Sequence, residues 1–164
     1  MNKGLLLLLM LISNAVLPGT FQANLNALTL KMKIIGVKDG DTVEGLYYQF
    51  PINIRLQHID APEKKQAFGT KSKEKLSELC FGKNVTIISS GKNGSYDSRG
   101  RLIAEVFLED GTNVNKEMVK SGLAWHYKKY SSSNEYERLE EFAKTRRLGL
   151  WSDSNAVSPW SFRR

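Results

Sequence analysis

The chain has 164 residues, 41% of them hydrophobic, so it holds enough apolar material for one compact core and is too short for two. Its 24 lysine and arginine residues against 17 acidic ones give a formal charge of +7, which favours nucleic acid or an anionic membrane surface as partner. A single cysteine, Cys80, excludes a fold held by internal disulfides, and its apolar neighbours predict a small buried side chain.

The first 23 residues form a separate unit of the sequence. One positive charge, Lys3, precedes the apolar run 5–12, and Pro18 and Gly19 follow that run, which is typical of a cleavable signal peptide. The run is far shorter than the ~20 residues of a membrane-spanning helix, so we expect no stable membrane anchor. The sequence therefore predicts a signal peptide over 1–23 and a protein that is secreted or periplasmic.

The next part of the chain predicts a three-stranded meander. Apolar and polar residues alternate from Leu28 to Val37 with the period of two that belongs to a half-buried strand. Turn-forming residues at 39–41 separate it from a β-branched and aromatic strand, Thr42 to Phe50, which Pro51 is expected to end. A third alternating strand is predicted over 52–57.

The rest of the chain predicts two more strands and three helices. In chain order they are a helix over 70–81 ended by Gly82, strands over 85–88 and 102–108, a helix over 114–121 closed by Gly122, and a helix that begins at Ser132, with Glu135 at capping-box spacing, and is ended by Gly149. A glycine-rich, basic and mobile loop is expected over 91–100. The pattern predicts an α+β, mainly β, fold: a five-stranded OB-type barrel with three helices.

Three carboxylates fall near the ends of predicted strands. Asp41 follows the first strand, Asp60 follows the third, and Glu63 comes three residues later, behind the stiff Pro62. Two aspartates brought together by neighbouring strands repel each other unless a cation lies between them, and oxygen ligands favour Ca²⁺ or Mg²⁺. Glu63 is then a candidate general base that takes a proton from a water attacking phosphorus.

Two arginines accompany these carboxylates. Arg55 lies in the third strand on the face opposite its apolar residues, and Arg101 begins the fifth strand directly after the glycine-rich loop. Guanidinium groups suit the charge that spreads over phosphoryl oxygens in the transition state, so we predict that both bind one phosphate. The two histidines, His58 and His126, stand among core-like neighbours and are expected to have a structural role.

Three segments occur together in this order: Val37–Thr42 with the letters VKDGDT, Arg55–Glu63 with an arginine, an aspartate and a glutamate in the spacing R-x4-D-x2-E, and Arg99–Leu102. This combination resembles the staphylococcal nuclease (thermonuclease, micrococcal nuclease) family from about Leu28 to Trp151. The resemblance implies a five-stranded OB barrel with three helices. It also implies a Ca²⁺-dependent endonuclease that hydrolyses phosphodiester bonds of DNA and RNA and leaves 3′-phosphate ends.

The resemblance assigns metal binding and phosphate chemistry to separate residues. It implies that the calcium ligands are the side chains of Asp41 and Asp60 and the backbone carbonyl of Ala61. It implies that the catalytic residues are Arg55, Glu63 and Arg101. The chain departs from the family pattern in a shorter loop after Glu63, in Ser98–Arg99 where the family has Lys-Tyr, and in tyrosines that align only roughly, so base preference does not transfer.

The predicted organisation is the signal peptide, a thermonuclease-like OB-barrel domain over 24–152 and an extended C-terminal tail over 153–164. The tail contains Trp160, which either docks on the barrel or extends the nucleic-acid surface. We expect a monomer with DNA and RNA as substrates. The alternative is a non-catalytic nucleic-acid-binding OB-fold module, which would be expected to lose metal carboxylates or the base, whereas here all five positions are filled.

Overall fold

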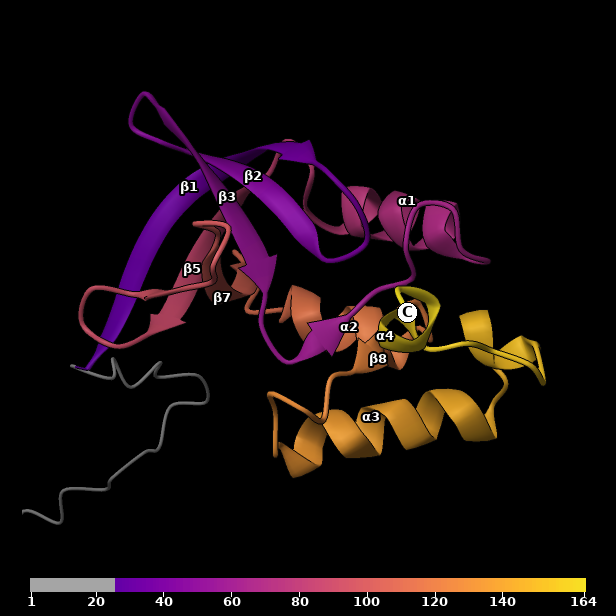
Figure 1. Ribbon diagram of the computed structural model, residues 1–164. Helices are drawn as coiled ribbons and strands as arrows, with labels where there is room; N and C mark the ends of the chain where they lie inside the picture. Colours follow the sequence, from indigo (N-terminus) through magenta and orange to yellow (C-terminus); the bar gives the residue numbers. More distant parts are fainter. Residues whose placement is uncertain (1–25) are drawn as a thin grey trace, which may run out of the picture.

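A parallel strand pair closes the main sheet into a barrel (Figure 1). The structure, a computed structural model, describes residues 26–164, so the predicted signal peptide lies outside the described residues. The barrel strands are β1 (Ala27–Val37), β2 (Thr42–Tyr47), β3 (Phe50–Leu56), β5 (Asn84–Ser90) and β7 (Leu102–Leu108). Antiparallel pairing runs in the order β3-β2-β1-β5-β7, and β3 then pairs with β7 in parallel. The five predicted barrel strands and the OB-type α+β fold are confirmed.

The strand β1 is shared between the two halves of the barrel. Its first part, 27–33, pairs with β5, and its last part, 33–37, pairs with β2. A register shift between Ile34 and Gly36 marks an irregularity of the bulge type, which bends a strand and helps a sheet to curl. Alternate residues point inward because side chains on a strand change face at every step. The fully buried residues of the barrel interior are Ile34, Val43, Ile54, Ile87, Leu102, Ala104 and Val106.

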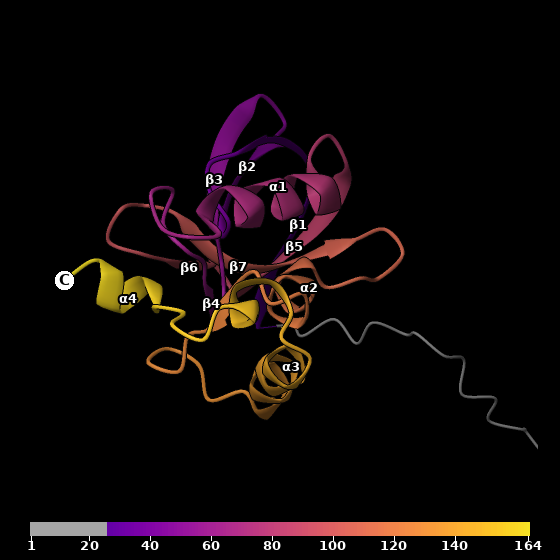
Figure 2. The same ribbon diagram turned by 90° about the vertical axis from the view of Figure 1, so that its right-hand side faces the viewer.

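Three helices cover one side of the barrel, as predicted. They are α1 (Gly69–Cys80), α2 (Val114–Lys120) and α3 (Asn134–Thr145). The helix α2 contacts α1, α3 and β7, so it lies between the barrel and α3 (Figures 1 and 2). Gly82, at φ +75, follows the end of α1, and Cys80, the last residue of that helix, is fully buried, as expected. No helix within residues 26–164 has the length and apolar character needed to span a membrane.

Five further elements are too short for a sequence pattern to reveal. They are β4 (Ile59–Asp60), β6 (Ser95–Tyr96), β8 (Trp125–His126), the 3-10 helix η1 (Gly149–Ser152) and α4 (Pro159–Phe162). The strands β4 and β8 form a two-stranded antiparallel sheet that ties the end of the barrel to the segment before α3. The glycine-rich loop contains β6, which pairs with β7. The helix α4 lies in the segment for which the sequence predicts an extended tail.

Three predicted boundaries were wrong. Pro51 does not end a strand, because β2 ends at Tyr47 and Pro51 lies inside β3. Only residues 54–56 of β3 pair with β7, so Pro51 lies where that edge of β3 has no partner strand, and the missing N–H of proline is tolerated there. The last long helix begins at Asn134 rather than at Ser132, and it ends at Thr145, four residues before Gly149. The capping-box serine therefore does not cap the helix.

Candidate active site

The turn between β1 and β2 places Asp41 next to the end of β3. Asp41 and Asp60 are buried, with 6% and 2% of their surface exposed, and both lie at one end of the barrel. The turn can sit this deep because Gly40 has no side chain: a Cβ there would overlap Ser72 Oγ of α1 and the Cβ of Ala61. The backbone N–H of Ala61 also donates to Asp41 Oδ2 at 2.7 Å. The two predicted calcium carboxylates are therefore brought together.

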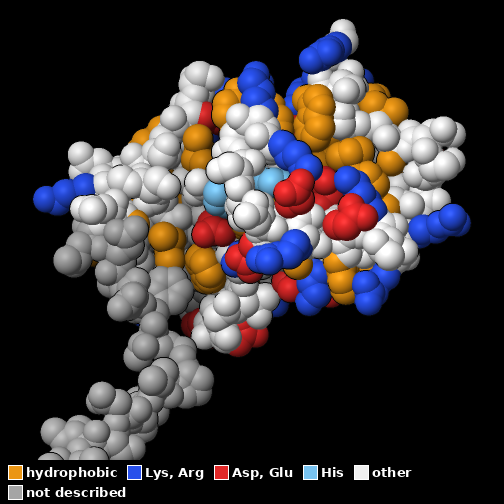
Figure 3. Space-filling model, turned by 90° about the horizontal axis from the view of Figure 1, so that it is seen from below, with side chains coloured by type: hydrophobic (Ala, Val, Ile, Leu, Met, Phe, Trp, Pro, Cys, Tyr) orange, Lys and Arg blue, Asp and Glu red, His pale blue; other side chains and the backbone are white. Residues whose placement is uncertain are grey.

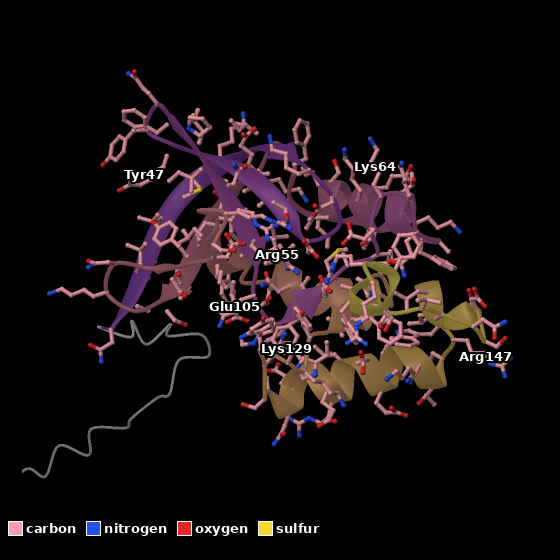
Figure 4. The ribbon with its side chains drawn as sticks, in the orientation of Figure 1. Tyr47, Arg55, Lys64, Glu105, Lys129 and Arg147 are labelled. Atoms are coloured by element: carbon pink, nitrogen blue, oxygen red, sulfur yellow. The ribbon has the colours of Figure 1, made fainter. Side chains whose placement is uncertain are left out.

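Arg55 lies between these two carboxylates. Its Nη2 is 2.9 Å from Asp60 Oδ1 and 3.1 Å from Asp41 Oδ2. Its Nη1 donates to the backbone carbonyls of Leu56 and Ile59 at 2.8 and 2.9 Å. Figure 4 shows Arg55 between the barrel and the helices, and only 13% of its side chain is exposed. The guanidinium does point away from the apolar face, as predicted, but its donors are held by protein oxygens.

Arg101 reaches the same carboxylates through one hydroxyl group. Its Nη1 donates to Thr42 Oγ1 at 3.0 Å, and that hydroxyl donates to Asp41 Oδ1 at 3.1 Å. On its other side Arg101 forms an ion pair with Asp97, with Nη2 2.7 Å from Oδ2. Asp97 also accepts hydrogen bonds from the backbone N–H groups of Arg99 and Arg101, which fix the end of the glycine-rich loop. Arg55 and Arg101 are thus both linked to Asp41.

Glu63 is the most accessible of the predicted site residues. About 40% of its side chain is exposed, and its backbone is fixed by a turn in which Gln66 N–H donates to the Glu63 carbonyl at 2.8 Å. Gly69, the first residue of α1, packs so closely on that carbonyl that a Cβ at 69 would overlap it. The carboxylate forms an ion pair with Arg163 of the C-terminal segment, with Nη1 2.5 Å from Oε1.

Arg163 also binds Asp60, with Nη2 2.6 Å from Oδ2, so one guanidinium bridges a predicted metal ligand and the predicted base. The sequence did not reveal this residue. Asp39 was also missed: burial and the charge of Asp41 raise the pKa of Asp39 to about 6, and its Oδ1 accepts from the Asp41 N–H at 3.0 Å. Burial likewise raises the pKa of Asp60, against the hydrogen bond from Arg163. The site is therefore an acidic cluster whose negative charge is compensated by the guanidinium groups of Arg55 and Arg163.

The donor set fits a hard cation. Two buried carboxylates and the neighbouring carbonyl of Ala61 are oxygen ligands of the kind that Ca²⁺ takes, and repulsion between Asp41 and Asp60 would be relieved by a positive ion. Within residues 26–164 no three His, Cys, Asp or Glu side chains gather as a metal site. Calcium takes about 6–8 oxygen ligands, so water and substrate oxygens would have to complete its shell.

Comparison with known proteins identifies the family. A model described as "Staphylococcal nuclease homologue" matches residues 53–153, which begin within β3 and include β4, α1 and the glycine-rich loop. The chain belongs to the staphylococcal nuclease family. An "Uncharacterized endonuclease" of Haemophilus influenzae is 43% identical over 133 residues, covering 80% of this chain and 72% of that protein. A "Micrococcal nuclease" of Shigella flexneri is 36% identical over 138 residues, covering 80% of this chain and 79% of its own.

A third relative, "Protein ParB" of Escherichia coli, is 36% identical over 145 residues, which is 82% of this chain and 80% of that protein. With relatives named endonuclease and micrococcal nuclease over most of its length, this chain is a nuclease and therefore a hydrolase. Nucleic acid is its substrate class. The predicted family, fold and enzyme class are confirmed.

Beside the carboxylates the nuclease has a basic and aromatic groove. It has a volume of about 520 Å³ and is lined by Tyr127, Lys128, Lys129, Trp160, Arg163 and Arg164. The rings of Tyr127 and Trp160 stack with their planes 7° apart and their centres 5.3 Å apart. Aromatic faces next to cationic side chains are the combination that binds single-stranded nucleic acid. The groove is continuous with the site, because Arg163 belongs to both.

The face formed by α3 is different. Seen from below, basic and acidic side chains are intermixed on it (Figure 3). Ion pairs join Lys116 to Glu135 and Lys128 to Glu137 at 2.8 and 2.6 Å. This face therefore offers no continuous basic surface to a polyanion, and the groove beside the carboxylates is the better candidate.

Proposed function

We propose that this nuclease is a Ca²⁺-dependent endonuclease that hydrolyses phosphodiester bonds of both DNA and RNA and leaves 3′-phosphate ends. The observation that carries the proposal is the position of Arg55 between two buried aspartates, with Glu63 tied to the same cluster through Arg163. Asp41, Asp60 and the carbonyl of Ala61 would hold the ion, which would supply charge stabilisation to the phosphoryl oxygens.

The roles of the other residues follow from their positions. Glu63 is the accessible carboxylate, so it is the group that can take a proton from an attacking water. Arg55 and Arg101 would donate to the phosphoryl oxygens as charge builds on them, and their links to Asp41 would keep both guanidiniums beside the carboxylates that hold the ion. The groove would bind the strand on one side of the scissile phosphate.

We also propose that the nuclease is exported and acts as a monomer. The support for export is the short apolar run after Lys3, which has the form of a cleavable signal peptide. Cleavage would leave the OB-barrel domain, 24–152, and the C-terminal segment, 153–164, as the mature protein. Identifying the N-terminal residue of secreted material tests this: a terminus near Asn24 supports export, and an intact Met1 contradicts it.

The central test measures cleavage of a supercoiled plasmid and of an RNA, with calcium and with a chelator. We expect cleavage of both substrates in calcium only. Glu63→Gln should slow cleavage by about 10²–10⁴-fold, the range of a general base, and Arg101→Ala by about 10²–10³-fold. Lys64→Gln is the matched control, because Lys64 is exposed next to Glu63, and it should cut at the native rate.

The product ends test the finer claim. Fragments with 3′-phosphates cannot prime a polymerase until a phosphatase has treated them, so primer extension before and after phosphatase distinguishes the two polarities. Absence of calcium-dependent cleavage by the native chain would sink the proposed function. Native-like cleavage by Glu63→Gln would remove only the role given to Glu63.

A further inference from the structure

The C-terminal segment 157–164 lies against the candidate active site (Figures 1 and 2). Its helix α4 is anchored by aromatic packing: Trp160 stacks on Tyr127 and meets the edge of Trp125 at 5.6 Å between ring centres. Pro159 is buried, and Gln66 Nε2 donates to the carbonyl of Val157. Gln66 belongs to the turn that fixes Glu63, so the segment is attached to the site at two places.

The bound segment occupies the carboxylate oxygens that calcium would need. Asp60 Oδ2 accepts from Arg163, and Asp60 Oδ1 accepts from Arg55. Asp41 is satisfied by the Ala61 N–H, the Thr42 hydroxyl and Arg55. A cation that binds Asp60 through Oδ2 therefore competes with the guanidinium of Arg163.

Of the two guanidiniums on Asp60, Arg163 is the one that can leave. Its side chain is 41% exposed, against 13% for Arg55, and no backbone carbonyl of the barrel holds it. Arg163 follows α4 and belongs to none of the barrel strands, so its release disturbs the C-terminal segment and leaves the barrel core intact. Its second partner is Glu63, so the same guanidinium covers the candidate base.

We propose that Arg163 is an internal cation that competes with calcium for Asp60 and masks Glu63, so that the segment 157–164 is a displaceable latch on the site. Calcium binding and release of the latch are then coupled, and by linkage each promotes the other to the same extent. The inference rests on the calcium site of the proposed function. The proposal gives the segment 157–164 a regulatory role, which is separate from the roles of the barrel residues.

Calorimetric titration of the purified protein with calcium tests the competition without any need for catalysis. Arg163→Gln removes the competitor, so it should bind calcium about tenfold more tightly than the native chain, a factor that corresponds to roughly one charge-assisted hydrogen bond. Arg164→Gln is the matched control: it makes the same change in charge at the neighbouring position, where the described residues show no ion pair to a carboxylate. It should bind calcium within about twofold of the native affinity, since exposed charges interact weakly.

A second variant loosens the latch and leaves Arg163 in place. Trp160→Ala removes the stacking on Tyr127, so it should also tighten calcium binding, by a smaller factor than Arg163→Gln. Hydrogen exchange gives an independent measurement. In the native protein, calcium should speed amide exchange in 157–164 and leave exchange in β1 and β5 unchanged.

Three results would overturn the latch. They are equal calcium affinities of Arg163→Gln and Arg164→Gln, weaker binding by Arg163→Gln, and no effect of calcium on exchange in the segment. Weaker nucleic-acid binding by Arg163→Gln, with unchanged calcium affinity, would instead make Arg163 a substrate-binding residue. These outcomes are separable from the proposed function. If the native chain cleaves in calcium but Arg163→Gln leaves the calcium affinity unchanged, only the latch is wrong. If Arg163→Gln tightens calcium binding but the native chain does not cleave, only the proposed endonuclease activity is wrong.

Discussion

Gly40 shows, at the scale of single residues, how the site depends on close packing. A side chain at this position would overlap Ser72 and Ala61, both of which are buried. Overpacking of this kind costs about 1–3 kcal/mol. We expect Gly40→Ala to lower the free energy of unfolding by about 2 kcal/mol in urea titrations and to slow cleavage by about 10²-fold, because the turn moves Asp41 out of position.

The control for Gly40→Ala is Gly91→Ala. A Cβ at Gly91 meets nothing within 4 Å. Because the φ of Gly91 is +79, the substitution introduces backbone strain but no steric overlap. That variant should lose about 1–2 kcal/mol of stability and cleave at the native rate. If both variants cleave at equal rates, close packing at Gly40 does not position Asp41.

Arg55 gives a second prediction for a single residue. Removal of one partner of a buried ion pair leaves an uncompensated charge and lowers the free energy of unfolding by about 3–5 kcal/mol. In the presence of a chelator, Arg55→Ala should therefore unfold at a much lower urea concentration than the native chain. Calcium should restore part of the lost stability, because it replaces the missing positive charge between Asp41 and Asp60. An equal loss of stability with and without calcium would mean that the ion does not bind between these carboxylates.

A hydroxyl group between two histidines is the feature of interest at the scale of elements. Ser131 Oγ lies 2.9 Å from His58 Nδ1 and 2.9 Å from His126 Nε2, which joins the loop after β3 to the strand β8 and the start of α3. One hydroxyl donates to one ring and accepts from the other, so the arrangement suits neutral rings. Burial lowers the pKa of His58 and of His126. The expectation that both histidines are structural stays a prediction, and this contact supports it.

These two pKa shifts predict how stability depends on pH. A histidine whose folded pKa is lowered binds protons in the unfolded state first, so stability is lost as the pH falls below about 6.5. The contribution of the two histidines to the free energy of unfolding should therefore decrease between about pH 7.5 and pH 5.5, whereas Asp39, whose pKa is raised to about 6, contributes with the opposite sign. His126→Gln should reduce the slope, because one of the two groups no longer titrates. Urea titrations across this range measure it, and identical slopes in the two proteins would contradict the prediction.

The elements differ in how far the sequence predicts them. The strand β1 and the strand β7 carry local alternation over many residues, so their positions follow from which face is buried. The strands β4 and β8 have two residues each, too few for a pattern, and they exist because the barrel and the helices bring them together. The start of α3 was misplaced because residues 131–133 are all serine, so local capping rules do not distinguish Ser132 from Ser133, which is the N-cap residue in the structure.

At the scale of the whole molecule, the same distinction applies to the site. The motifs around Asp41, Arg55 and Asp60 are local, and the structure brings these three residues into contact, as the strand pattern predicts. Arg163 lies 103 residues from Asp60 along the chain, in a segment with no periodic pattern, so its contact with that carboxylate has no local signature. The presence of Trp160 in the tail was the one available indication that the segment docks.

Charge is the property of the whole molecule that governs its affinity for substrate. The formal charge is +7, but acidic residues of α3 form ion pairs with Lys116 and with Lys128, the second of which lines the groove beside the site. Lys129 lines the groove and has no carboxylate partner among the described residues. In Figure 4 it lies at the helical end of the molecule, far from Tyr47 on the β2–β3 hairpin. Lys31 is exposed beside Tyr47, so it serves as the control.

Lys129→Gln should weaken binding of a single-stranded oligonucleotide and reduce the dependence of log K on log salt concentration by about one. The reason is that a lysine that neutralises one phosphate releases one counterion, and the variant loses that release. Lys31→Gln has the same net charge but lies away from the groove, so its salt dependence should match that of the native chain. Fluorescence anisotropy in chelator, at several salt concentrations, measures both variants without cleavage. Equal slopes for Lys129→Gln and Lys31→Gln would show that binding depends on net charge alone, and the groove would then lose its place in substrate binding.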